Sequence, residues 1–182
     1  MLFNLFGKKE SGDDNHVFID RAYVSSTAKM KACAELAKAA PDTIFICWFD
    51  ETLERFKKFF KEQGIEEDRL IIARYMNTHL LATKTAVFTE HYPLHTKELD
   101  LIKNWATEKI VVYSAMDEPL FKHFGSDKLI PLMKMMGMKE DEVIEHSMVT
   151  KSIIKGQEKI AGQVSSEHPA YSQGDWMKKN IK

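Results

Sequence analysis

Short apolar runs alternate with longer amphipathic stretches through the first two thirds of the chain. The apolar runs are rich in Val, Ile and Phe and do not alternate cleanly with polar residues. Strands that are buried on both faces of a sheet have this pattern. The runs that we predict as strands cover residues 17–20, 43–49, 69–75, 85–90 and 109–114.

The stretches between these runs have helical spacing and predict helices over residues 26–40, 51–63 and 95–106. Pro41 and Gly64 follow the first two, as helix stop signals do. Strands that alternate with helices suit parallel crossover connections. The pattern therefore predicts an α/β fold with a mostly parallel sheet of about five strands.

Beyond the last predicted strand the chain changes to helical patterns. Ser114 and Asp117 are three residues apart, which is the spacing of a helix-capping pair. Pro119 suits the first turn of a short helix, and Gly125 suits its end. Both ends of this short helix are thus predicted from local signals.

Further helices are predicted towards the C-terminus. Ser126 and Gly137 are expected to cap the two ends of one of them. Residues 139–163 predict one or two more, with their acids at the N-terminal end, where the helix dipole favours negative charge. A last short helical patch surrounds Trp176.

These boundaries divide the chain into four segments. We predict a flexible N-terminal arm over residues 1–15, an α/β domain over 16–125, a helical extension over 126–164 and a tail over 165–182. The arm begins "MLFNLFGKK", which is too short to be a signal peptide or a membrane span. We expect a loose arm, and its contact with a membrane surface is the alternative.

Composition narrows the classes of function. The chain has 182 residues, 44% of them hydrophobic and 29% charged, with a net charge of -1. This charge provides no field to attract nucleic acid, so we predict no nucleic-acid partner. Cys33 and Cys47 are too few for a cysteine-rich zinc site and are expected to be reduced core residues of a cytoplasmic protein.

Polar residues at the ends of the predicted strands are the candidates for ligand binding. In a parallel sheet the binding crevice lies at the carboxyl ends of the strands. No glycine-rich phosphate loop and no spacing of a known catalytic unit is present. These side chains could bind a small polar ligand, or they could serve only as caps and turn residues; they are Asp50, Arg74, Glu90 and His91, with Asp20 and Ser114 beside them.

His91 and His95 are four residues apart, like two metal ligands on one helical face. Pro93 lies between them and disfavours a regular helical turn. We therefore predict a pair of surface histidines and no metal site. No cofactor is predicted either.

Methionines gather near the predicted helix end at Gly137. Leu129, Leu132, Met133 and Met136 recur at helical spacing and can share one face. Methionine fills irregular cores and is also favoured at adaptable binding surfaces. We favour packing or partner binding over ligation of a soft metal, and the candidate residues are Met133, Met135, Met136 and Met138.

Residues 111–160, "VVYSAMDEPLFKHFGSDKLIPLMKMMGMKEDEVIEHSMVTKSIIKGQEKI", resemble a segment of SecA, the preprotein translocase motor ATPase. In that family the segment closes the second RecA-like motor domain and leads into the helical scaffold. The similar positions are Ser114, Asp117, Leu120, Phe124, Gly137, Met138, Glu142, Ile144, Glu145, His146, Lys151, Ile153, Gln157 and Lys159.

A weaker similarity extends upstream to Thr43. Glu51 and Leu53 stand in a context similar to the strand and helix that open the second motor domain. Thr89 and Glu90 match a T-E-R-H segment of the family. The resemblance implies a three-layer RecA-like domain with a C-terminal helical extension.

The departures from the family concern its catalytic parts. The arginine-rich run that meets nucleotide phosphates is replaced here by "LIKNWATEK", residues 101–109. Nothing corresponds to the first motor domain, with its phosphate loop and magnesium-binding acids. Phosphoryl transfer has little electrostatic stabilisation without these groups, so we predict that the chain is not an enzyme.

The sequence leads to two hypotheses of different classes. The first is a non-catalytic SecA-like domain, a degenerate stand-alone fragment that acts by contact with a protein partner or with further copies of itself, in a role linked to protein export. Its contact surface would be the C-terminal helical region, because that segment packs in SecA on parts that this chain lacks. The alternative is a small-ligand or nucleotide-binding protein that uses the strand-end crevice.

Overall fold

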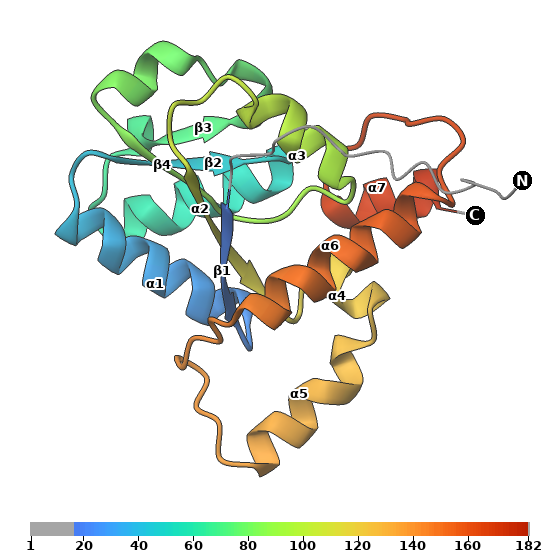
Figure 1. The fold of residues 1–182 in the computed structure, drawn as a ribbon. Coiled ribbons are helices and arrows are strands. Elements are labelled where there is room, and N and C mark those ends of the chain that lie inside the picture. The colour runs from blue at the N-terminus through green and yellow to red at the C-terminus, as the bar shows by residue number, and fades with distance from the viewer. Residues whose placement is uncertain (1–16, 182) are drawn as a thin grey trace, which may run out of the picture.

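Five parallel strands form the centre of the computed structural model, which describes residues 17–181 (Figure 1). They lie side by side in the order β1-β5-β4-β2-β3, and every pairing among them is parallel. The predicted sheet is thereby confirmed. Its strands are β1 (Val17–Tyr23), β2 (Thr43–Cys47), β3 (Leu70–Ile72), β4 (Thr85–Phe88) and β5 (Lys109–Ala115).

Helices cover both faces of the sheet, which gives the expected three-layer α/β fold. α1 (Ser26–Ala39) and α2 (Asp50–Glu62) pack on one face, where Phe45 and Cys47 of β2 meet Phe56 and Phe60 of α2. On the other face lie Ile46 and Phe88, packed with Ile102 of α3 (His95–Ile102). Phe45 and Ile46 are neighbours in β2, and alternate residues of a strand point to opposite faces.

A third hydrophobic cluster joins the C-terminal helices to the carboxyl end of the sheet. Its centre is Leu120, Ile153, Ile160 and Trp176, all almost completely buried. The helices of this region are α4 (Pro119–His123), α5 (Ser126–Met135), α6 (Ser147–Ala161) and α7 (Gln173–Asn180). In Figure 1, α5 stands away from the rest of the molecule, at the bottom of the view.

Residues 17–181 also contain three short 3-10 helices, and one of them shortens a predicted strand. η1 (Glu67–Arg69) and η3 (Thr78–Ala82) flank β3 and β4. η2 (Ala73–Tyr75) begins where β3 ends, so the strand predicted over 69–75 is shorter than expected. The helix predicted over 95–106 likewise ends at Ile102.

The predicted capping pair of Ser114 and Asp117 is wrong. Ser114 is buried inside β5. Asp117 accepts hydrogen bonds from the backbone N–H (2.8 Å) and the hydroxyl (2.6 Å) of Ser26, at the start of α1. Its carboxylate therefore satisfies a helix that is remote in sequence.

The segment that precedes α6 was predicted to be helical and is not. Ile144 pairs with Ala22 of β1 in an antiparallel bridge, through N–H to O distances of 2.8 and 3.1 Å. This pairing holds the chain extended, so the acids of residues 140–145 lie before the helix. His146 caps α6, because its ring accepts a hydrogen bond from the backbone N–H of Met148.

Other local signals are confirmed. Gly64, Gly125 and Gly137 have positive φ angles at helix ends, as predicted, and Pro119 begins α4. The prediction that Ser126 caps α5 is wrong: Gly125 is the cap residue, Ser126 is the first residue of the helix, and its hydroxyl donates to the carbonyl of Met116.

Both cysteines are free and buried, as expected. Among the helices of residues 17–181, none has the length and apolar character needed to cross a membrane. The predicted arm over residues 1–15 and its contact with a membrane surface lie outside the described residues.

Candidate functional site

The four strand-end candidates separate into three different structures. Asp50 and Arg74 form a two-point ion pair on the surface, with distances of 2.6 and 3.0 Å between their nitrogen and oxygen atoms. Asp50 begins α2, where a carboxylate suits the helix dipole. The hydrogen bond from Arg74 lowers the pKa of Asp50. Asp50 and Arg74 thus satisfy each other's charge.

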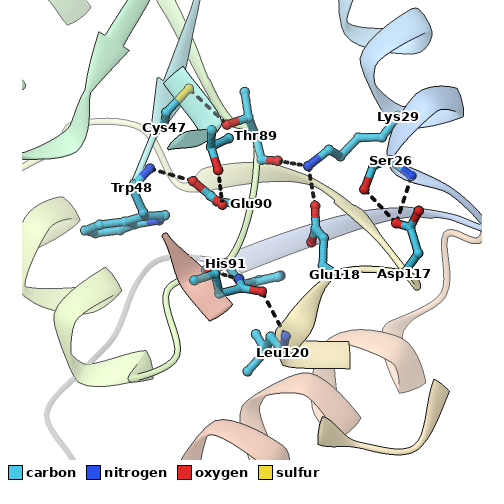
Figure 2. Close-up of polar contacts among 12 residues, drawn as sticks. Ser26, Lys29, Cys47, Trp48, Thr89, Glu90, His91, Asp117, Glu118 and Leu120 are labelled. Atoms are coloured by element: carbon cyan, nitrogen blue, oxygen red, sulfur yellow. Dashed lines mark hydrogen bonds and ion pairs between the residues drawn. The ribbon is translucent and has the colours of Figure 1, made fainter. Parts of the chain in front are cut away.

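Glu90 is buried and organises the start of α2 (Figure 2). Its carboxylate accepts hydrogen bonds from the backbone N–H of Trp48 (3.0 Å) and of Phe49 (3.2 Å) and from the Thr52 hydroxyl (2.7 Å). Burial raises the pKa of Glu90 to about 7, although Lys29 nearby opposes this rise. Glu90, just beyond the end of β4, therefore fixes the turn that leads from β2 into α2.

Lys29 is a buried cation that the sequence analysis did not single out. Its ammonium donates to the carbonyl of Thr89 (2.6 Å) and pairs with the carboxylate of Glu118 (Figure 2). Burial lowers the pKa of this lysine, but the carboxylates of Glu118 and Glu90 outweigh it, so the pKa is raised. No local sequence signal marks Lys29, because its partners lie about 60 and 89 residues away along the chain.

A small cavity lies beside these groups, at the carboxyl ends of the strands. Its volume is about 40 Å³, and its walls include Ser26, Lys29, Thr52, Glu90 and Glu118. Oε2 of Glu118 is buried and has no hydrogen-bond partner among the described residues. The cavity has room for a few water molecules, whereas ligand sites usually measure about 300 to 1,000 Å³.

His91 is buried between two carboxylates, so the prediction of a surface histidine pair is wrong for it. Nδ1 lies 2.9 Å from Oε1 of Glu98, and Nε2 contacts the carboxylate of Asp20 in β1. Burial would lower the pKa of His91, yet the two carboxylates raise it well above its ordinary value. The ring is therefore an imidazolium that donates from both nitrogens.

Glu98 links this centre to the C-terminal helices. Its other oxygen lies 3.0 Å from Nδ1 of His95 and accepts a hydrogen bond of 3.0 Å from Gln157 of α6. Burial alone would raise the pKa of Glu98, but the charge of His91 brings it down to about 2. Pro93 and the loop before α3 let one carboxylate reach both histidines, a geometry that their four-residue spacing did not reveal.

Among the strand-end groups of the described residues, Asp50 thus pairs with Arg74 and Asp20 with His91, Glu90 binds the turn before α2, and the hydroxyl of Ser114 has no hydrogen-bond partner. Asp20 faces His91 from inside β1, and Ser114 is buried within β5. No group of three or more histidine, cysteine or carboxylate side chains within residues 17–181 is arranged to hold a metal ion. The arrangement joins strands to helices and leaves little room for a ligand.

The methionine region, residues 129–138, differs from the strand-end groups because most of its large apolar side chains are exposed to solvent. Met135, the last residue of α5, and Met136, which caps the helix, are 85% and 79% exposed, and Leu129 and Leu132 are about half exposed. Ser126 is the only buried residue of this helix. Exposed apolar side chains gathered in this way mark interaction surfaces.

The helix ends in a motif that folds the methionines together. Gly137 has φ +88°, its N–H bonds to the carbonyl of Lys134 (3.1 Å), and the N–H of Met138 bonds to the carbonyl of Met133 (3.1 Å). This is the Schellman arrangement, in which the residue after the glycine contacts the last turn of the helix. It accounts for the close spacing of Met133 and Met138 without a metal.

An open groove follows from this fold-back, and we call it the methionine groove. Its volume is about 520 Å³. Met135 lies outside it, so three of the four candidate methionines share one hollow. Its apolar lining is Met133, Met136, Met138, Val143 and Ile144, and its polar lining includes Glu142 and Glu145.

A second apolar groove of about 340 Å³ runs between α4, α5 and α6. Its lining includes Leu129 of α5, Met148 of α6 and Phe124 at the end of α4. α5 thus contributes side chains to both hollows, Leu129 to this groove and Met133 to the methionine groove. The sequence analysis pointed to the methionines but not to this second groove, whose walls come together only in the folded chain.

Comparison with known proteins gives a local similarity to SecA. No protein-family model matches the chain. Over 48 residues, 26% of this chain, it is 54% identical to protein translocase subunit SecA of Acidithiobacillus ferrooxidans. It is 45% identical over 53 residues to subunit SecA 1 of Chlorobium chlorochromatii, and 43% over 53 residues to SecA of Chlorobaculum tepidum.

The extent of these matches limits what they establish. Each covers 26% to 29% of this chain and about 5% of the length of the SecA protein. The similarity to SecA predicted from the sequence is therefore confirmed for part of the chain: this protein contains a segment related to SecA.

Proposed function

We propose that this protein is a non-catalytic SecA-like domain that acts as a protein-protein interaction module linked to protein export. The observation that carries the proposal is α5, an amphipathic helix whose apolar side chains, among them Leu132 and Met135, stand exposed together with Met136 just after it. Burying such side chains against a partner stabilises a complex by about 25 cal/mol for each Å² of apolar surface.

The strand-end groups support a non-catalytic role. Asp50 is bonded to Arg74, Glu90 holds the start of α2, and His91 lies between Asp20 and Glu98. A catalytic acid or base needs access to a substrate, and each of these side chains is bonded to a structural partner of its own. The small cavity beside Lys29 offers little room for a substrate.

The link to export rests on the similarity to SecA, whose name describes a protein translocase subunit. The similarity covers a small part of those proteins, so activity and partners are not carried over with it. What supports an inherited contact role is the exposed helix itself. A partner protein, or a further copy of the chain, would cover it.

Cross-linking from α5 tests the proposal. A photoreactive residue at position 132 should capture one specific partner, which is then purified and titrated against the wild-type chain. Met136→Glu should weaken that complex at least tenfold, because it places a charge in an apolar contact. Leu80→Glu is the matched control, since Leu80 is an exposed apolar residue on η3, away from α5. Equal binding by wild type and Met136→Glu would reject the module.

Thermal unfolding in the presence of nucleotides distinguishes the interaction module from the alternative, a small-ligand or nucleotide-binding protein. A nucleotide that binds the folded chain raises its melting temperature at saturating concentration. The module predicts no shift with any nucleotide. A shift that disappears in Arg74→Ala would favour the alternative instead.

A further inference from the structure

One wall of the methionine groove is strongly acidic. The stretch of residues 140–145, "EDEVIE", contains four acids and no base. Val143 and Ile144 of this stretch line the groove together with Glu142 and Glu145. The bridge between Ile144 and Ala22 holds the stretch in place beside β1. An apolar hollow and a row of carboxylates are therefore fixed side by side.

Two of these carboxylates line the methionine groove, and one of them, Glu142, forms no ion pair with a described residue. Glu145 pairs with Arg21, at 2.9 Å. Glu142 accepts a hydrogen bond from the backbone N–H of Lys139, and no cation within residues 17–181 forms an ion pair with it. Glu140 and Asp141 line a different hollow, which Lys31 of α1 also lines.

We propose that the occupant of the methionine groove is a basic amphipathic segment of the partner protein, with apolar side chains in the groove and lysines or arginines along residues 140–145. This inference rests on the proposed function and specifies the chemistry of its partner. Methionine side chains adapt to apolar anchors of different shapes. The carboxylates favour cations and reject acidic segments, which gives selectivity.

A second copy of the chain fits this groove less well. In a symmetric pair of facing grooves, the acidic stretch of each copy would lie close to that of the other. Like charges placed together across an interface oppose association. The charge pattern therefore favours a different, basic protein over self-association.

Two synthetic peptides test the inference. Both form an amphipathic helix of about five turns with the same leucines and phenylalanines on one face; one has lysines on the other face and the second has glutamates. The wild-type chain should bind the lysine peptide at least tenfold more tightly. That preference should shrink as salt is raised from about 50 mM to about 300 mM, because ions screen exposed charges.

Variants locate the binding to the groove. Glu142→Lys should remove most of the preference for the lysine peptide, and Met136→Glu should weaken binding of both peptides. Glu108→Lys is the matched control, because it makes the same charge change at an exposed residue before β5. It should leave the preference intact.

The outcomes separate this inference from the proposed function. Equal binding of the two peptides, or a preference that Glu142→Lys leaves unchanged, would overturn the basic partner even if Met136→Glu still breaks the cross-linked complex. A lysine peptide that binds Met136→Glu as tightly as wild type would also overturn it, since the contact would then be charge alone. The proposed function is tested separately, by titrating the cross-linked partner against wild type and Met136→Glu. Equal binding there would reject the interaction module, whatever the two peptides do.

Discussion

Nδ1 of His91 lies 2.9 Å from Oε1 of Glu98, and both side chains are almost completely buried. The imidazolium also contacts Asp20 of β1 on its other side. One cation thus neutralises two buried carboxylates, one from the sheet and one from α3. The pair fixes the loop between β4 and α3, whose backbone also bonds to Gln173 and Gln157.

His91→Ala should therefore destabilise the fold strongly. It leaves Asp20 and Glu98 buried without the imidazolium between them, and removing one partner of a buried ion pair costs about 3 to 5 kcal/mol. Arg74→Ala breaks the exposed pair with Asp50 and should cost no more than about 1 kcal/mol. Urea unfolding followed by circular dichroism measures both. Similar losses for the two variants would contradict the buried ionic centre.

Glu90 predicts a pH dependence of stability. An unfolded glutamate titrates near pH 4.3, whereas burial raises the pKa of Glu90 to about 7 in the folded protein. Between these values the folded state holds more of the proton, so stability falls as the pH rises. From about pH 5 to about pH 8, wild type should lose up to about 3 kcal/mol relative to Glu90→Gln.

Urea unfolding at several pH values measures this difference. Glu108→Gln is the control, since Glu108 is exposed, and its curve should run parallel to that of wild type. A constant gap between wild type and Glu90→Gln across the pH range would show that Glu90 titrates normally.

The sheet could be predicted from the sequence because its signals are local. Each strand is an apolar, β-branched run, and Gly64 and Gly137 mark helix ends through the positive φ that glycine tolerates. The grouping of the methionines could also be predicted, because helical spacing shows which residues share a face. The Schellman motif then follows from Gly137 and its neighbours.

The polar contacts could not be predicted, because they join distant parts of the chain. Asp117 has the local spacing of a cap for its own helix, yet it binds Ser26, 91 residues away. Residues 140–145 have the acids of a helix start, but pairing of Ile144 with β1 competes successfully with helix formation. Which of two partners a carboxylate takes depends on the assembled fold.

The C-terminal segment should be essential for stability. Trp176 of α7 is 0% exposed, and its indole N–H donates to Glu167 (3.1 Å). Gln173 of the same helix bonds to the backbone of Leu120 and of His91. Trp176→Ala should lower the free energy of unfolding by about 3 to 5 kcal/mol. Trp48→Phe, which keeps an aromatic ring, should cost less. A small effect of Trp176→Ala would mean that α7 is dispensable.

Substitution of Gly156 in α6 tests how closely α6 packs against Phe124 at the end of α4. In an exposed helix interior, Gly→Ala stabilises by about 1 kcal/mol. At Gly156, however, a Cβ atom would lie 2.3 Å from the ring of Phe124, and such overpacking costs about 1 to 3 kcal/mol. We expect the clash to outweigh the gain in helix propensity, so Gly156→Ala should lower the melting temperature. Phe124→Leu makes room, and the double variant Gly156→Ala/Phe124→Leu should be more stable than the sum of the two single effects predicts. Additive effects in thermal unfolding would contradict the close contact between these two helices.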